Sequence, residues 1–237
     1  MRIQKYISNA GYCSRRKAEE LILEGRVRIG NRNAEIGDQI DEKKAKVFVD
    51  GKAILPESKK VYVLINKPKG YVTTTDDPEG RKTVLELVKG ISQRVYPVGR
   101  LDYDTEGLLL LTNDGDLTNR LTHPSHQVEK CYKVRCDGKI PKSAFKELAD
   151  GILIDESYRT APSRIYSVDV GEDQTTCIIG IMEGHNRQVR KMFEMVGYPV
   201  TALKRISIGF LTLDKLKRGE FRHLTKQEVE KLKKLGN

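Results

Sequence analysis

The chain has 237 residues and contains no hydrophobic run long enough to cross a membrane. A membrane-spanning helix needs about 18 or more consecutive apolar residues, whereas the leucine run at residues 108–111 has four. The first residues, Met1-Arg-Ile-Gln-Lys, also lack the apolar segment of a secretory signal peptide, so we expect no export. The composition, 38% apolar and 32% charged, is that of a folded soluble protein and argues against disordered and membrane classes.

Cysteine is scarce, and its spacing argues against the usual cysteine-based frameworks. The four cysteines are Cys13, Cys131, Cys136 and Cys177, and no two of them form a CxxC pair. This spacing disfavours a disulfide scaffold and a zinc site, and it favours free thiols in a reducing compartment. We therefore expect a cytoplasmic protein.

Positive charge exceeds negative charge, and the excess is concentrated near the N-terminus. The net charge is +10, and residues 1–60 carry 14 Lys and Arg against 9 Asp and Glu. The remainder, residues 61–237, carries 29 against 24, which is the same excess over three times the length. A basic excess favours a polyanionic partner such as nucleic acid. A basic excess is equally typical of a solvated charged surface, so the sequence motifs are needed to decide between that and nucleic-acid binding.

Residues 1–58 predict a compact module of two short helices followed by small strands. Apolar residues spaced for one helical face precede Gly11, and Ser14 is placed to cap a second helix. Gly25 then suits the left-handed residue that follows a helix. Asp50-Gly51, between alternating apolar residues, predicts a hairpin turn.

Two strings in this module resemble the small RNA-binding domain first seen in small-subunit ribosomal protein S4, also called the αL motif. They are Lys5-Tyr-Ile-Ser-Asn-Ala-Gly-Tyr-Cys-Ser-Arg-Arg-Lys-Ala-Glu-Glu-Leu-Ile and Gly25-Arg-Val-Arg-Ile. The resemblance implies binding of structured RNA, with Arg15, Arg16 and Lys17 against its phosphates. The family usually has Asn-Gly in the first hairpin turn, where this chain has Gly30-Asn31.

A second domain is expected after this module. Length alone allows one large domain or two smaller ones. The polar string Pro56-Glu-Ser-Lys-Lys is typical of a linker, and a strand signal at residues 61–65 follows it. We therefore predict one domain at residues 1–58 and another at residues 59–237.

A loop rich in carboxylates is the first candidate for chemistry. Asp102, Asp104 and Glu106 lie within five residues, beside Arg100 and just before the leucine run. A carboxylate at the edge of a buried strand is partly desolvated, and a nearby cation keeps it ionised at low cost. Such a group can act as a nucleophile or as a general acid or base. The residue types also fit turn and capping hydrogen bonds.

Three strings resemble the motifs of the RsuA/RluB/RluF family of pseudouridine synthases. The loop string, Gly99-Arg-Leu-Asp-Tyr-Asp-Thr-Glu-Gly-Leu-Leu-Leu-Leu-Thr-Asn-Asp-Gly, is similar to the signature loop of the family. Asn66-Lys-Pro-Lys-Gly is similar to its first motif, and Glu183-Gly-His-Asn-Arg-Gln-Val-Arg-Lys-Met-Phe is similar to its last. All three occur in family order behind the RNA-binding module, so the resemblance covers essentially the full chain.

The resemblance implies an enzyme that isomerises uridine in ribosomal RNA to pseudouridine. The bond from the base nitrogen to the sugar breaks, the base rotates, and a carbon of the base forms the new bond. No electron transfer is involved, so no cofactor and no metal are expected, and the chain has no GxGxxG fingerprint, P-loop or metal-ligand cluster. The strand-heavy order predicts an α+β fold. The resemblance implies a largely antiparallel mixed sheet with a central cleft and Asp102 at its floor.

The resemblance also assigns roles in the cleft. Asp102 matches the essential aspartate of the family, which acts on the sugar or on the base, and the sequence leaves both open. Tyr132 matches the tyrosine that packs on the target base. Arg190 is the predicted partner that holds Asp102 oriented and ionised, because an arginine fork binds a carboxylate with two parallel donors. Arg187 is the alternative partner and otherwise an RNA ligand.

Further basic residues are predicted to bind the RNA. Arg100 is expected to contact the RNA beside the target nucleotide, which must be flipped out because its sugar–base bond is inaccessible in a stack. Lys67 and Lys69 are predicted phosphate contacts rather than catalysts. The expected partner is ribosomal RNA, free or in a pre-ribosomal particle. The protein is expected to act as a monomer, away from membranes.

Two other functions are compatible with parts of this pattern. A non-catalytic RNA-binding or ribosome-assembly protein fits the N-terminal module but leaves the Asp102 loop without a purpose. A glycosyl hydrolase would use two of the three loop carboxylates, but a pair that flanks a sugar from opposite sides is not evident on one short loop. Within the favoured function, the loop string and residues 76–82 resemble the large-subunit branch, which acts on 23S-type RNA. The sequence leaves small-subunit ribosomal RNA open as the alternative substrate.

Overall fold

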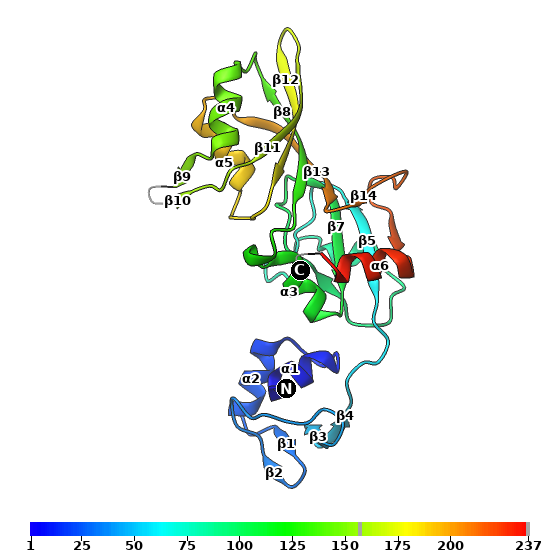
Figure 1. Cartoon of the computed structure of the whole chain (residues 1–237). Coiled ribbons are helices and arrows are strands. Elements are labelled where there is room, and N and C mark those ends of the chain that lie inside the picture. Colours follow the sequence, from blue (N-terminus) through cyan, green and yellow to red (C-terminus); the bar gives the residue numbers. More distant parts are fainter. Residues whose placement is uncertain (156–157, 236–237) are drawn as a thin grey trace. The chain divides into compact units, whose positions relative to one another are not determined.

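The computed structural model describes residues 1–155 and 158–235 (Figure 1). The chain forms two compact units, and the first comprises Met1–Val61 with the short segments Ile91–Val95 and Asn113–Gly115. The rest of the chain forms the second unit. No described helix is long and apolar enough to cross a bilayer. The domain boundary at residue 58 stays a prediction.

The first unit contains two helices and a four-stranded antiparallel sheet with the order β2-β1-β3-β4. The element bounds are α1 Ile3–Asn9, α2 Arg15–Leu23, β1 Val27–Ile29, β2 Arg32–Asn33, β3 Val47–Val49 and β4 Lys52–Ile54. The predicted Ser14 cap is present, since its hydroxyl accepts the N–H of Lys17 at 3.2 Å. Gly25 has a left-handed φ of 70°, and Asp50 and Gly51 form the β3–β4 turn with φ of 48° and 75°.

The Gly30-Asn31 pair suits the turn that it occupies. Ile29 of β1 pairs with Arg32 of β2, so Gly30 and Asn31 form a two-residue hairpin loop. Gly30 has a φ of 59°, whereas the φ of Asn31 is not positive. A type II′ turn places glycine first and needs a positive φ only there. The departure from Asn-Gly therefore changes the turn type and keeps the hairpin.

The second unit is built on a nine-stranded sheet with the main order β11-β12-β8-β13-β7-β5-β15, in which β14 pairs with β13 and β6 with β7. The strands are β5 Tyr62–Lys67, β6 Tyr96–Pro97, β7 Glu106–Thr112, β8 Lys130–Asp137, β11 Arg164–Val170, β12 Gln174–Ile181, β13 Val200–Ile208, β14 Leu211–Thr212 and β15 Phe221–His223. All described strand pairs of this sheet are antiparallel except β7 with β13. The predicted α+β fold with a largely antiparallel mixed sheet is confirmed.

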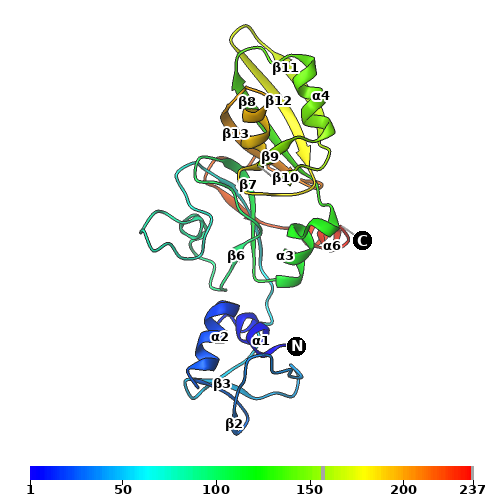
Figure 2. The same ribbon diagram turned by 90° about the vertical axis from the view of Figure 1, so that its left-hand side faces the viewer.

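The remaining elements of this unit are helices and a small second sheet. They are α3 Gly115–Thr122, α4 Lys142–Asp150, α5 Gln188–Met195, α6 Lys226–Lys233, the 3-10 helices η1 Val84–Val88 and η2 Pro124–His126, and the strand pair β9 Leu153–Asp155 and β10 Tyr158–Arg159. Figures 1 and 2 show α4 and α5 beside the strands of one end of the sheet. On β8, Tyr132 and Val134 are buried whereas Lys133 and Arg135 are exposed. One face of this part of the sheet is therefore covered, and Tyr132 lies on it.

A glycine allows β7 and β13 to approach each other. Gly107 has a φ of 113°, and a Cβ atom there would overlap the backbone carbonyl of Arg205. Arg205 is the β13 residue that pairs with Gly107 in the parallel register. Because β7 begins at Glu106, directly after the Asp102 loop, this close pairing fixes where the loop ends.

Gly107→Ala is expected to lower the free energy of unfolding by about 2 kcal/mol, because the methyl group meets backbone and the φ is strained. Urea unfolding measures the loss. Gly219→Ala is the matched control, since Gly219 has a φ of 83° but no atom within 4 Å of an added Cβ. Its expected loss is about 1 kcal/mol or less. Equal losses in the two variants would show that the β7–β13 approach does not require glycine.

Candidate active site

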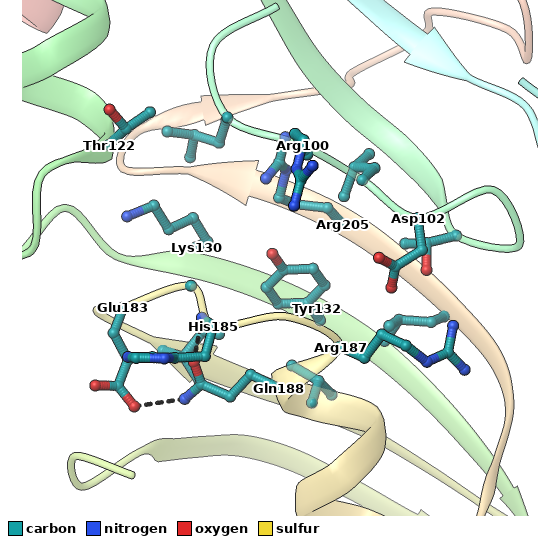
Figure 3. A pocket seen from close by; sticks show the side chains of 18 of the residues that line it. Arg100, Asp102, Thr122, Lys130, Tyr132, Glu183, His185, Arg187, Gln188 and Arg205 are labelled. Carbon is teal, nitrogen blue, oxygen red and sulfur yellow. Dashed lines mark hydrogen bonds between the residues drawn. The ribbon is translucent and has the colours of Figure 1, made fainter. Parts of the chain in front are cut away.

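The second unit contains a pocket between the Asp102 loop, the sheet and the start of α5 (Figure 3). Four of the predicted site residues line it: Arg100 and Asp102 from the loop, Tyr132 from β8, and Arg187 at the start of α5. These residues are far apart in the sequence, and the strand order brings them together. The expectation of a cleft lined by Asp102 therefore agrees with the geometry.

The backbone of the Asp102 loop is held from behind by a buried lysine. Lys67 is 0% exposed, and its Nζ donates to the carbonyl oxygens of Asp102 at 3.0 Å and Thr105 at 2.8 Å. A third hydrogen bond goes to the carbonyl of Pro68 at 3.1 Å. Burial lowers the pKa of Lys67 to about 8. The prediction that Lys67 contacts phosphate is therefore wrong, because its ammonium group is enclosed and fully used. Lys69 is exposed, and its role stays a prediction.

The Asp102 side chain is left free by this arrangement. It is half-buried and faces the pocket (Figure 3). Among the described residues, its carboxylate has no ion pair within 4.0 Å and no hydrogen-bond partner. The other carboxylate that lines the pocket, Glu183, has both oxygens engaged. Asp102 is therefore the carboxylate of the pocket that is available to a ligand.

The predicted ion pair between Arg190 and Asp102 is not present. Arg190 Nη2 lies 3.0 Å from Asp104 Oδ2 and donates to the carbonyl oxygen of Asp104 at 3.2 Å. Arg190 Nη1 donates to the carbonyl oxygen of Val200 at 3.1 Å. Arg187, the alternative partner, also faces Asp104, at 3.5 Å. Asp104, two residues further along the loop, is the carboxylate that meets α5. Arg190 thus ties α5 to the loop from outside the pocket.

Two cations inside the pocket were not identified from the sequence. Arg205 of β13 pairs across the sheet with Tyr132, and both line the pocket together with Lys130 of β8. Tyr132 and Arg205 are 9% and 4% exposed. Burial, with a smaller contribution from the charge of Arg205, lowers the pKa of Lys130 to about 8. The only signal in the sequence is the spacing of Lys130, which lies two residues before Tyr132 and so shares its face of the strand.

The opposite wall is a rigid hydrogen-bonded group formed by the last predicted motif. Gln188 Nε2 donates to Glu183 Oε1 at 2.5 Å, and the Tyr158 hydroxyl donates to Glu183 Oε2 at 2.6 Å. The ring of His185 lies 3.7 Å from that of Tyr158, centroid to centroid. Burial and the bond to Glu183 raise the pKa of Tyr158 to about 12. This wall fixes the segment that presents Arg187.

The exposed cations lie where RNA could reach them. Arg100 and Arg187 are exposed and line the pocket. In the first unit, Arg15, Arg16 and Lys17 form the exposed first turn of α2, and Lys17 pairs with Glu20 at 2.8 Å. Neither Arg15 nor Arg16 has an ion pair with a described residue. Their predicted contacts with RNA stay predictions.

Comparison with protein families matches both units. A family model described as RNA pseudouridylate synthase matches residues 61–195, and a model of the S4 domain matches residues 1–45. The ribosomal large subunit pseudouridine synthase B of Bacillus subtilis (strain 168) is 44% identical over 239 residues, covering 100% of this chain and 97% of the relative. An uncharacterized RNA pseudouridine synthase of Aquifex aeolicus (strain VF5) is 42% identical, covering 98% and 93%.

Two further matches also cover nearly the whole of this chain. The ribosomal large subunit pseudouridine synthase B of Vibrio vulnificus (strain CMCP6) is 37% identical, covering 99% of this chain and 75% of the relative. A solved structure described as the crystal structure of pseudouridylate synthase has a TM-score of 0.72 and 31% identity. It covers 98% of this chain and 99% of its own, so the likeness extends over both units.

Proposed function

The chain belongs to the RNA pseudouridylate synthase family, and from this premise we propose that it converts a uridine of large-subunit ribosomal RNA to pseudouridine. Two relatives that match essentially the whole of this chain are named ribosomal large subunit pseudouridine synthase B, and they support this choice of RNA. The observation that carries the proposal is the pocket itself, in which the free carboxylate of Asp102 and the buried ring of Tyr132 line one cavity.

The reaction moves the sugar from one atom of the base to another. The bond between N1 and C1′ breaks, a bond between C5 and C1′ forms, C5 loses its proton and N1 gains one. A carboxylate can act as nucleophile or move this proton. Asp102 is the candidate, because its carboxylate has no partner among the described residues and its backbone is fixed by Lys67. The reaction is an isomerisation, so no cofactor is required.

Tyr132 provides the surface against which the base packs. A target nucleotide must leave its stack to enter the pocket, because its sugar–base bond is otherwise inaccessible. Stacking on an aromatic ring is worth ~1–3 kcal/mol and tolerates rotation of the base. Arg100 and Arg187 would contact the backbone of the flipped nucleotide at the rim.

The alternatives of a glycosyl hydrolase and a non-catalytic RNA-binding protein have less support. A hydrolase would need a second available carboxylate at the pocket, but both oxygens of Glu183 are hydrogen-bonded. Asp104 and Glu106 pair with Arg190 and Arg218, each at 3.0 Å, outside the pocket. A binding protein has no use for a free aspartate in a cavity. The partner in this proposal is ribosomal RNA, free or pre-ribosomal, and the protein acts as a cytoplasmic monomer with domains at residues 1–58 and 59–237.

Tritium release tests the proposed function directly. Ribosomal RNA transcribed with uridine labelled at C5 should release tritium with purified protein, because C5 exchanges its hydrogen for the sugar. A large-subunit transcript should release it in preference to a small-subunit transcript. Binding of either transcript without any release would favour the non-catalytic alternative.

Arg15, Arg16 and Lys17 are expected to anchor RNA by charge. Changing all three to glutamine should weaken RNA binding and flatten its dependence on salt, because fewer counterions are released. The expected loss is about tenfold or more at moderate salt. Turnover at saturating RNA should change little, because the pocket is built from the second unit. Filter binding over a range of salt concentrations measures the slope.

A second triple variant is the control for net charge. Lys43, Lys46 and Lys52 are exposed and belong to the same unit but lie outside α2. Their replacement by glutamine removes the same charge, and the salt slope should stay nearly unchanged. Equal slopes in the two triple variants would mean that α2 is only a solvated surface.

A further inference from the structure

Two cations flank Tyr132 inside the pocket. Lys130 precedes Tyr132 by two residues on β8, so the two side chains leave the same face of the sheet. Arg205 of β13 is the residue that pairs with Tyr132 across the antiparallel register. All three line the pocket (Figure 3). The aromatic ring proposed as the base platform thus has a donor along its strand and another across the sheet.

Each of these cations has a donor that no described residue accepts from. Arg205 donates one hydrogen bond, from Nε to the carbonyl oxygen of Leu108 at 2.7 Å, and its buried Nη2 has no partner in the described structure. Lys130 has no hydrogen bond and no ion pair with a described residue. Arg205 Nη2 is therefore a buried donor without an acceptor, which is rare, and the half-buried Lys130 side chain lines the same pocket. A ligand that supplies acceptors explains both.

The surroundings indicate the shape of that ligand. Apart from these cations, the inner walls are mainly aliphatic, from Leu121, Ile181, Val189, Leu203 and Ile208. A ligand with flat apolar faces and a polar edge fits such a space. The exposed cations Arg100 and Arg187 are better placed for phosphate, which keeps its hydration at a rim. Lys130 and Arg205, which are less exposed than Arg100 and Arg187, therefore face the base.

We infer that Lys130 and Arg205 donate hydrogen bonds to the two carbonyl oxygens of the target uracil and thereby select uracil over cytosine. This inference rests on the proposed function. Uracil presents carbonyl oxygens at C2 and C4, and both are acceptors. Cytosine has an amino group at C4, whose hydrogens would meet an ammonium or guanidinium donor. A site built from donors rejects such a base because its own groups are left unpaired.

The symmetry of uracil makes this pair useful through the whole reaction. Half a turn about the axis through N3 and C6 brings C5 to the place of N1 and exchanges the two carbonyl oxygens. Donors placed for one orientation are therefore placed for the other. Lys130 and Arg205 would hold the base before and after it rotates, without any movement of the protein.

Binding of matched RNAs to a protein that cannot turn over tests the pair. One probe is a large-subunit RNA fragment that carries an unmodified uridine at the target position. The other is the same fragment with cytidine at that position. Full-length Asp102→Asn protein should bind the uridine fragment at least about tenfold more tightly. Adding Lys130→Met and Arg205→Met should reduce the ratio of the two affinities to about twofold or less.

Matched variants separate recognition from damage to the fold. Lys133 follows Tyr132 on β8 but lies on the opposite, exposed face of the strand. Lys133→Met should therefore keep the full ratio of the two affinities. Lys130→Arg keeps a donor and should restore most of it. If Arg205→Met does not fold, Lys130→Met alone must still reduce the ratio.

The outcomes distinguish this inference from the proposed function. Equal weakening of both fragments by the double variant would overturn the inference, because it would show a structural role only. An unchanged ratio together with normal pseudouridine formation by the wild-type protein would also overturn it and leave the proposed function standing. Failure of the wild-type protein to modify the uridine fragment would overturn both.

Discussion

Asp102→Asn is expected to abolish pseudouridine formation, with a loss of at least ~10³-fold, because an amide can serve neither as nucleophile nor as base. The substitution keeps the size of the side chain. The carboxylate has no partner among the described residues, and Lys67 and Thr105 bind only the backbone carbonyl of Asp102. The free energy of unfolding should therefore stay unchanged.

Tritium release from RNA labelled at C5 of uridine measures this loss, and urea unfolding checks the fold. Asp104→Asn and Glu106→Gln are the matched controls on the same loop. Both should retain measurable activity, since neither carboxylate lines the pocket. Normal turnover by Asp102→Asn would remove Asp102 from the chemistry. Complete loss in either control would instead revive a mechanism with two carboxylates.

Arg190→Met is expected to lower turnover by about 10²-fold, because loop placement governs how Asp102 meets the substrate. Arg190 is a positioning residue here. Its guanidinium binds Asp104 at 3.0 Å and the carbonyl oxygen of Val200 at 3.1 Å, so it joins α5, the loop and β13. Without it, Lys67 still binds the loop backbone from one side, but the contact between α5 and the loop is reduced to the longer approach of Arg187 to Asp104 at 3.5 Å.

The kinetic signature separates positioning from RNA binding. Arg190→Met should lower kcat and leave KM nearly unchanged, and Arg190→Lys should keep partial activity because it supplies charge without the planar fork. Asp104→Asn weakens the same contact, so the effects of the two substitutions should not add in the double variant. A rise in KM alone, or full additivity, would show that Arg190 does not act through Asp104.

Features that depend on neighbouring residues could be predicted from the sequence. The Ser14 cap, the left-handed Gly25 and the turn at Asp50 and Gly51 each follow from local backbone chemistry, and each is present. The leucines at 108–111 predicted a buried strand, which is β7. The family resemblance, carried by three separated strings, is confirmed by models that match both units.

Features that depend on strand register could not be predicted. Lys67 pairs with Gly107 across β5 and β7, and this register places its Nζ beneath the Asp102 loop instead of at the surface. Asp102 and Asp104 differ only in which side of the loop they face. Nothing in their spacing shows that α5 contacts Asp104 rather than Asp102. The sequence therefore predicts the wrong carboxylate as the partner of Arg190.

The positions of Lys130 and Arg205 in the pocket could not be predicted for a related reason. The strand β13 was not predicted, and a register shift after Arg205 interrupts the alternation that would have marked its inward positions. Lys130 stands at the start of β8, where a lysine is ordinarily exposed. Only the folded sheet shows that both side chains flank Tyr132.

Pseudouridine mapping of ribosomal RNA tests the central claim most directly. The RNA is compared among cells that produce this protein, cells that lack it, and cells that produce only the Asp102→Asn variant. The expected result is a pseudouridine in large-subunit RNA that is present in the first and absent from the other two. An identical map in all three would contradict the claim that this chain, through Asp102, forms pseudouridine in ribosomal RNA.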